Sequence, residues 1–301
     1  MAITKEHFDD FDVYIENSEY QFRHIKINED CFYDKICEYL LDEKKINAYT
    51  SVNIEITNEL TEQDYQNIYH RLIQFIDYEK IININDFLDS EIIKYLYENL
   101  EHKNEDLRRD KWGRIGEYIF NMILDSYFHL DCVVRKFALN TSPNMSVYGI
   151  DTVHCSLEDR IIYFGESKFV EHIKDGVKLI NKSLAEYDKQ IANEYLTISS
   201  RNVQRNINFV NEILNHNIAY TFQEFINKTG IETIGIPIFI AHAGDIDEEK
   251  VFEELKNVTR NSFYGLKTNY IVISFPILDK EKFRDSFINT VNSKLEELKN
   301  V

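Results

Sequence analysis

The sequence predicts an α/β protein in which helices flank a mixed central sheet. From about residue 105 onward, one helical segment precedes three strand-like segments and further helices, and strands and helices then alternate to residue 299. Of the 301 residues, 44% are hydrophobic and 13% are aromatic, which is enough apolar material for a sizeable core. The chain has only 3 prolines and 9 glycines, so we expect no linker-rich or low-complexity region.

Residues 1–104 are predicted to form a smaller α+β lobe, which a linker at 101–106 joins to the main domain, 105–301. Alternating polar and apolar residues on both sides of Asn17 predict a hairpin over 11–27. The other predicted elements of the lobe are a short helix over 31–41, a strand over 50–57, and helices over 61–77 and 89–100.

The main domain contains the more regular pattern. Its predicted elements are a helix over 106–129, strands near 131–139, 146–156 and 160–169, helices over 171–196, 200–215 and 221–228, a strand over 232–242, a helix over 247–258, a strand over 269–277 and a final helix over 279–299. This order is the reason for expecting a mixed sheet with helices on its faces.

The net charge of −18 comes from 52 acidic and 34 basic residues. It argues against a free-standing nucleic-acid binder, because affinity for DNA comes largely from cationic side chains. An acidic protein can still act on DNA through a local basic track, divalent cations or a partner that brings the DNA. The N-terminus has no apolar signal segment, and no run approaches the ~20 apolar residues of a membrane span. We therefore expect a soluble cytoplasmic protein without a membrane contact.

The segment "YGIDTVHCSLEDRIIYFGESK", residues 148–168, reads as a hairpin that carries charges inside apolar strands. Folding it about Glu158 and Asp159 places Asp151 directly opposite Glu166, with their side chains on one face of the sheet. Lys168 follows Glu166 by two residues and shares that face. One register therefore brings together two carboxylates and one ammonium group.

Two opposed carboxylates destabilise a sheet unless a cation lies between them. A hard ion such as Mg²⁺, or Mn²⁺, suits this place because it takes one or two protein carboxylates together with water and phosphate oxygens. Lys168 would then orient the attacking water or stabilise charge on a phosphate. Two plainer interpretations remain open: a solvent-facing sheet edge, and a structural salt bridge among Asp151, Glu166 and Lys168.

The helix before this hairpin contains "WGRIGEYIF", in which Gly113 and Gly116 permit close packing against a neighbour. Glu117 lies at the border of its apolar face. It is either a surface group or a third acid directed at the sheet.

Basic residues cluster in sequence around the acidic ones. They favour contact with nucleic-acid phosphates, although each stripe also suits a solvated helix face. The candidate nucleic-acid-binding residues are Lys174, Lys178 and Lys182 at intervals of four, Arg201 and Arg205, and Arg114.

The order Glu117, Asp151, then Glu166-Ser167-Lys168 resembles the PD-(D/E)XK nuclease pattern of a helix acid, a hairpin acid and E-x-K on the next strand. Ile150 stands where the pattern's name has proline. The segments "GRIGEYIF", "YGIDTVHC", "IIYFGESKF" and "IKDGVKLINKSLAEY" resemble the HamA family, the small subunit of Hachiman-type bacterial anti-phage defence systems. The resemblance is strongest over about 105–195.

This resemblance implies a restriction-endonuclease-like PD-(D/E)XK core and a metal-dependent DNase effector that hydrolyses phosphodiester bonds under the control of a superfamily 2 helicase, HamB. It implies that Asp151 and Glu166 are metal ligands, Lys168 is the catalytic lysine and Glu117 is the helix acid. The lobe over 1–104 would contact the helicase or cover the site. Two alternatives are a non-catalytic nuclease-like adaptor that binds a helicase or DNA, and a stand-alone restriction-type endonuclease.

Overall fold

The described strands form one 8-stranded sheet in the order β1-β2-β3-β8-β7-β6-β5-β4. The computed structural model describes residues 3–8, 11–17, 20–29, 31–42, 104–134, 149–156, 159–199, 221–244, 247–277 and 279–299, with a few residues between 61 and 69. The strands are β1 (Thr4–His7), β2 (Phe11–Asn17), β3 (Gln21–Ile27), β4 (Asp131–Val134), β5 (Thr152–Ser156), β6 (Ile161–Val170), β7 (Thr233–His242) and β8 (Lys267–Pro276). The central pairs β3–β8, β8–β7 and β7–β6 are parallel and the outer pairs are antiparallel, so the predicted mixed sheet is confirmed.

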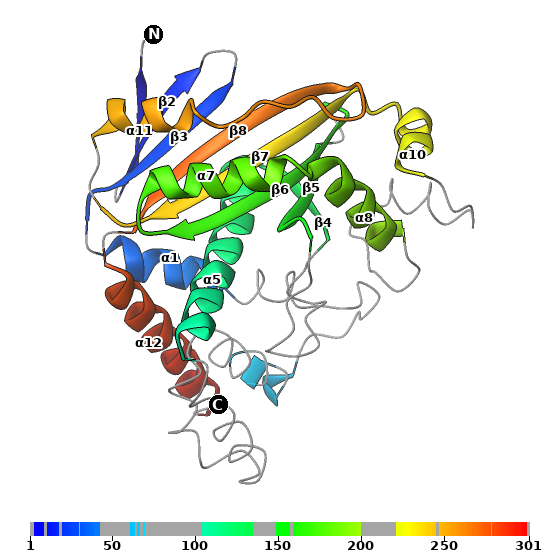
Figure 1. The fold of residues 1–301 in the computed structure, drawn as a ribbon. Coiled ribbons are helices and arrows are strands. Elements are labelled where there is room, and N and C mark those ends of the chain that lie inside the picture. The colour runs from blue at the N-terminus through cyan, green and yellow to red at the C-terminus, as the bar shows by residue number, and fades with distance from the viewer. Residues whose placement is uncertain are drawn as a thin grey trace.

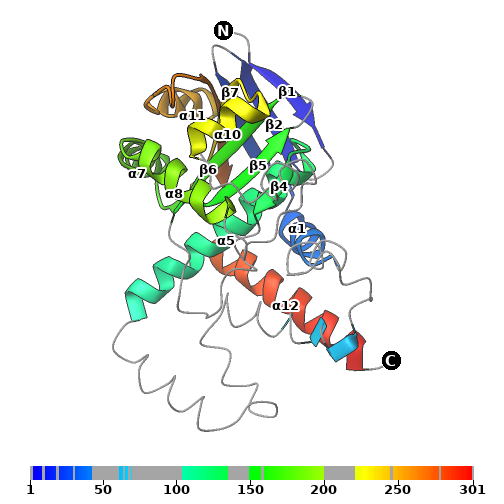
Figure 2. The same cartoon turned by 90° about the vertical axis from the view of Figure 1, so that its right-hand side faces the viewer.

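Helices cover both faces of this sheet. They are α1 (Phe32–Leu40), α5 (Asn104–Ser126), α7 (Ile173–Leu184), α8 (Tyr187–Ser199), α10 (Phe222–Thr229), α11 (Glu248–Leu255) and α12 (Lys280–Lys299). Helices α7, α8, α10 and α11 pack on one face, and α1, α5 and α12 pack on the other (Figures 1 and 2). The fold is therefore α/β with three layers. Among the described residues, no helix is both long and apolar enough to cross a membrane.

The first strands of the chain belong to the same sheet as the main domain. The predicted hairpin over 11–27 is present as β2 and β3, and β3 pairs in parallel with β8. Strand β1 has no counterpart in the prediction, because its four residues are polar and exposed and carry no alternating pattern. Helix α5 begins inside the predicted linker. The sheet thus extends across the predicted boundary, although the boundary itself stays a prediction.

Several predicted elements cannot be compared with the structure. The strand over 50–57 and the helices over 89–100 and 200–215 lie outside the described residues, and the helix over 61–77 lies mostly outside them.

Strand β7 shows why the core has two halves. All ten of its residues are buried, as expected for a parallel strand covered on both faces. Ile234 and Ile240 pack in the cluster that includes α7, α10 and α11, whereas Phe239 and Ala241 pack in the cluster of α5 and α12. The two-residue period of the strand therefore sends alternate side chains into separate apolar layers.

Gly235 in this strand has no room for a larger side chain. A Cβ atom there would lie 2.0 Å from Cδ1 of Tyr163 and 2.3 Å from its Cε1. We expect Gly235→Ala to lower the free energy of unfolding by about 1–3 kcal/mol, since the buried ring has to move. Gly113→Ala in α5 is the matched control, because nothing lies within 4 Å of that Cβ position. It should raise stability by up to ~1 kcal/mol. Urea unfolding measures both, and equal effects would contradict the packing described.

Candidate active site

The hairpin of β5 and β6 has the predicted register. Its pairs run from Thr152 opposite Gly165 to Ser156 opposite Ile161. Asp151 lies one residue before β5, and its N–H donates to the carbonyl oxygen of Gly165 over 3.0 Å. The two strands therefore stay in contact at Asp151, but this bond goes to Gly165, the partner of Thr152, so the pairing of Asp151 with Glu166 stays a prediction.

Glu166 and Lys168 form a largely buried ion pair on β6. The Nζ atom of Lys168 lies 2.5 Å from Oε1 of Glu166 and also donates to the carbonyl oxygen of Ser167 over 2.9 Å. Glu166 is 4% exposed, and the side chain of Lys168 is 26% exposed. This burial excludes the solvent-facing sheet edge, because water does not surround the carboxylate.

The Asp151 carboxylate is held by Ser167. Its Oδ2 accepts from the backbone N–H of Ser167 over 2.6 Å and from the hydroxyl over 2.9 Å. Asp151 therefore makes its direct bonds to Ser167, and it acts on Glu166 and Lys168 through the electric field of its charge. Ser167 thus positions the aspartate, a role that strand alternation alone does not predict.

The site disfavours charge on its glutamate and favours charge on its lysine. Burial and, after it, the negative charge of Asp151 raise the pKa of the Glu166 carboxyl, although Lys168 and the hydroxyl of Ser183 act in the opposite direction. Burial lowers the pKa of Lys168, but the carboxylates of Glu166 and Asp151 outweigh it, so the pKa lies above its usual value. Lys168 is therefore an ammonium at neutral pH, and its charge interacts favourably with both the Glu166 and the Asp151 carboxylates.

Glu117 approaches the same cluster from α5. The helix packs closely on β6, where the Cβ position of Gly116 lies 3.4 Å from the ring of Phe169. Glu117 is partly exposed, and its charge contributes to the raised pKa of Lys168. The structure thus brings Glu117, Asp151, Glu166 and Lys168 together around one end of β6, as the sequence predicts.

The prediction of one long helix over 171–196 is wrong. The structure has two helices there, α7 and α8, which are separated by Ala185 and Glu186. The N–H of Glu186 bonds to the carbonyl oxygen of Ser183, three residues back, which tightens the chain at this point. Contacts with β6 fix both sides of the turn. Ser183 donates to Oε1 of Glu166 over 2.8 Å, and the hydroxyl of Tyr187 donates to the carbonyl oxygen of Phe164 over 3.1 Å.

Sequence reasoning also missed a group of hydrogen-bonded polar side chains next to the acidic residues. Thr152 donates to Oδ1 of Asn121 over 2.5 Å, its hydroxyl lies 2.9 Å from Nδ1 of His154, and Asn121 donates to the carbonyl oxygen of Glu117 over 2.9 Å. This chain of bonds ties β5 to α5 next to Asp151 and Glu117. The available signal was the polar pair Thr152 and His154 on one face of an apolar strand.

The predicted lysines of α7 lie on its exposed face. Lys174, Lys178 and Lys182 are opposite the buried residues of the helix, and Lys178 is paired with Asp175 over 3.1 Å. Arg201 and Arg205, and the side chain of Arg114, lie outside the described residues. Contact with nucleic acid stays a prediction for all six.

The family model described as HamA matches residues 3–291, which is nearly the whole chain. The chain belongs to the HamA family. Comparison with curated proteins gave no match, and neither did comparison with solved structures. The resemblance read from the sequence is thereby confirmed for the family, while the PD-(D/E)XK core stays a prediction.

The donor atoms of this HamA-family chain suit an ion that needs few protein ligands. Within the described ranges, no group of three or more His, Cys, Asp or Glu side chains is arranged to hold a metal ion. Hydrogen bonds from described residues occupy Oδ2 of Asp151 and Oε1 of Glu166, which leaves one oxygen of each carboxylate for another contact. Two carboxylate oxygens completed by water and phosphate are a usual Mg²⁺ environment, so the residues fit the ion that the sequence predicts.

Proposed function

We propose that this chain is the metal-dependent DNase subunit of a Hachiman-type bacterial anti-phage defence system. The supporting observation is the cluster of Asp151, Glu166 and Lys168 at one hairpin, where Lys168 pairs with Glu166 and the charge of Asp151 acts on both groups. Membership in the HamA family supports the role in defence.

In this proposal, the carboxylates of Asp151 and Glu166 would hold Mg²⁺ or Mn²⁺. When bound, such an ion would supply a lower pKa for its water ligand and positive charge beside the phosphate. Lys168 stays protonated and supplies positive charge to the phosphate, because its carboxylate neighbours raise its pKa. Glu117 balances the charge of Lys168 from α5, and Ser167 and Ser183 orient the two ligand side chains.

A partner controls the reaction in this account. The net charge of −18 opposes spontaneous binding to DNA, so a superfamily 2 helicase of the HamB type would deliver the DNA. Lys174, Lys178 and Lys182 provide a local cationic surface on α7 for the delivered strand.

The test is degradation of plasmid and linear DNA by the chain with Mg²⁺, with and without the helicase and ATP. We expect cleavage that depends on the helicase and stops when EDTA removes the metal. Strong cleavage by the chain alone at physiological salt would contradict control by the partner. If neither DNA is cut while the chain still binds the helicase, the chain is a non-catalytic adaptor and the charges are structural.

Ser183 offers a finer test of the site. Ser183→Ala should slow cleavage by roughly fivefold, because one hydrogen bond of about 1 kcal/mol no longer orients the Glu166 carboxylate. The same substitution should raise the pKa of Glu166 further, since the hydroxyl bond lowers it. Single-turnover cleavage and a carbon-13 titration of the Glu166 carboxyl measure these effects. Ser286→Ala, at a buried serine of α12, is the control, and equal results for the two variants would contradict the positioning role.

A further inference from the structure

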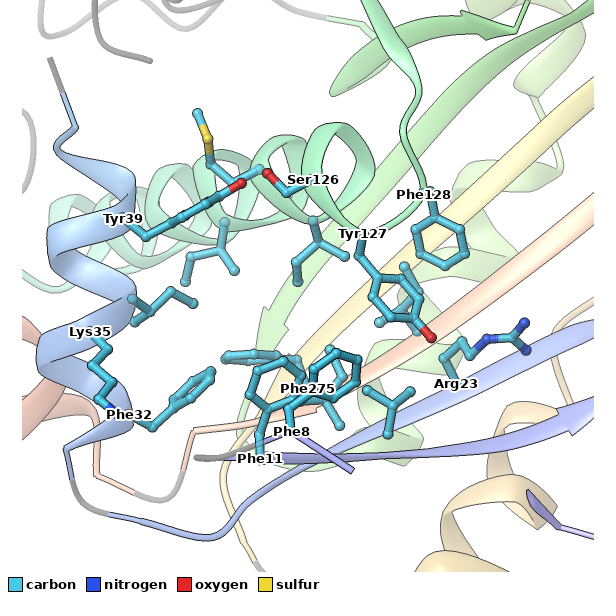
Figure 3. A pocket seen from close by; sticks show the side chains of 17 residues that line it. Phe8, Phe11, Arg23, Phe32, Lys35, Tyr39, Ser126, Tyr127, Phe128 and Phe275 are labelled. Atoms are coloured by element: carbon cyan, nitrogen blue, oxygen red, sulfur yellow. The ribbon is translucent and has the colours of Figure 1, made fainter. Parts of the chain in front are cut away.

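A cavity of about 350 Å³ lies on the sheet face that carries α1 and α5, away from the candidate active site (Figure 3). The N-terminal strands, α1, the C-terminal part of α5 and β8 enclose it. Apart from Arg23, Lys35 and Ser126, the described residues that line it are aliphatic, aromatic or, in Met122, a thioether. A concave, mostly apolar site of this size with few polar groups is typical of small-molecule binding.

Aromatic rings preform the cavity wall. Phe8 stacks on Phe11 with ring centroids 4.6 Å apart, Phe11 meets Phe32 edge-on at 5.3 Å, and Phe32 lies 6.0 Å from Phe275. The rings support one another, so the space between them persists without a ligand. Phe8 is 36% exposed, although its side chain is large and apolar. An apolar guest in the cavity would cover this exposed ring.

Arg23 supplies the polar group at the mouth of the cavity. Its side chain lies beside the hydroxyl of Tyr127 (Figure 3). Its Nη1 donates to Oδ1 of Asn17 and to the carbonyl oxygen of Phe22, each over 3.0 Å. Its Nε is buried and has no hydrogen-bond partner among the described residues. This atom is closed off from the cavity, but the Arg23 side chain is partly exposed where it lines the mouth, so an anionic oxygen there would gain a charge-assisted hydrogen bond from the guanidinium.

The neighbouring carboxylate does not serve this purpose. Glu6 accepts its hydrogen bond from the hydroxyl of Tyr127 over 2.5 Å and is exposed. The guanidinium at the mouth repels cationic guests locally, although the net charge of −18 attracts cations to the protein as a whole. The arrangement therefore complements a molecule that combines an apolar body with one negative group.

We infer that this cavity binds a small amphipathic carboxylate, with its apolar body between α1 and α5 and its acid group on Arg23. Ile119 and Ile123 of α5 line the cavity, and Glu117 lies on the same helix, so an occupant would contact the helix that carries a residue of the candidate site. The inference is independent of nuclease activity, because it concerns binding alone.

Calorimetric titration of the full chain with octanoate and with uncharged octanol tests the inference. Four proteins are compared: wild type, Arg23→Gln, Ile123→Trp to fill the cavity, and Lys26→Gln as the matched control. Lys26 is a cation of the same strand that pairs with Glu248 over 2.9 Å and does not line the cavity. Circular dichroism checks folding, and Ser126→Phe replaces Ile123→Trp if the latter does not fold.

We expect octanoate to bind wild type and Lys26→Gln equally. Arg23→Gln should weaken octanoate by about tenfold and leave octanol unchanged, because one charge-assisted hydrogen bond is lost. The filled variant should bind neither compound. Failure of octanoate to bind wild type would overturn the inference. The apolar surface would then be a candidate contact for a polypeptide partner. Equal octanoate binding by all four proteins would also overturn it, since the compound would then bind elsewhere.

Discussion

Glu166→Gln and Lys168→Met are each expected to lower the rate of Mg²⁺-dependent DNA cleavage by roughly 10²–10³-fold or more. The first change removes the charge of a carboxylate that is proposed to hold the metal. The second removes the ammonium that is proposed to face the phosphate and leaves the Glu166 carboxylate buried without its cation. Cleavage in the presence of the proposed helicase partner, measured under single-turnover conditions, gives the rate.

The double variant separates chemistry from stability. Removing one partner of a buried ion pair strands the other charge, so each single variant should also unfold more easily. Glu166→Gln with Lys168→Met replaces both charges by neutral groups of similar size and should recover most of that stability while staying inactive. The controls are Glu249→Gln and Lys250→Met on the exposed surface of α11. A double variant that folds and still cuts DNA would show that the pair is only structural.

Mild acid is expected to destabilise the protein through two buried histidines. Burial lowers the pKa of His154 to about 3 and the pKa of His242 to about 4, the latter in spite of an opposing bond to the carbonyl of Ala243. Nε2 of His154 has no hydrogen-bond partner among the described residues, so a proton there would find no acceptor. His242 bonds through Nε2 to Ser274 over 2.8 Å, and Ser274 lies 3.0 Å from Nδ1 of His24.

The direction follows from proton binding. Below the ordinary histidine pKa of about 6.5, the unfolded chain takes up protons that the folded chain refuses, so stability falls as the pH falls. Between about pH 7 and about pH 5, each histidine should contribute a loss on the order of 2 kcal/mol. Glu166 acts in the opposite direction. Its pKa is raised in the folded state, so the folded chain binds this proton more tightly than the unfolded chain, and this residue adds stability as the pH falls.

Urea unfolding at both pH values, for wild type, His154→Gln and His242→Gln, isolates the histidines. The contributions of Glu166 and the other acids are present in all three proteins and cancel in the differences. Each variant should therefore lose less stability on acidification than wild type. An identical loss in all three proteins would mean that these imidazoles are protonated in the folded state.

The sequence predicted the hairpin register because its information is local. Alternating side chains and turn residues define which residues of β5 and β6 meet, so the pairs from Thr152 opposite Gly165 to Ser156 opposite Ile161 could be predicted. The bond from Ser167 to Asp151 did not follow, because it depends on how the carboxylate turns at the end of the ladder. Ser183 reaches Glu166 from another helix, and no sequence spacing encodes that contact.

Long-range pairing explains the other differences. The parallel pairing of β3 with β8 joins residues about as far apart as the chain allows, so local patterns could not assign the first strands to the main sheet. The apolar period continues through Ala185 and Glu186, which made α7 and α8 look like one helix. The turn between them depends on tertiary bonds from Ser183 and Tyr187 to β6.

The central claim is that Asp151 and Glu166 together hold a divalent cation, and binding of Mn²⁺ tests it most directly. The measurement is the paramagnetic resonance signal of free Mn²⁺ during titration of wild type, Asp151→Asn, Glu166→Gln and the control Glu16→Gln, a buried acid that pairs with Lys256 over 3.0 Å. We expect one class of Mn²⁺ site in wild type and the control, and its loss in the two hairpin variants. Equal Mn²⁺ binding by all four proteins, or none by wild type, would contradict it.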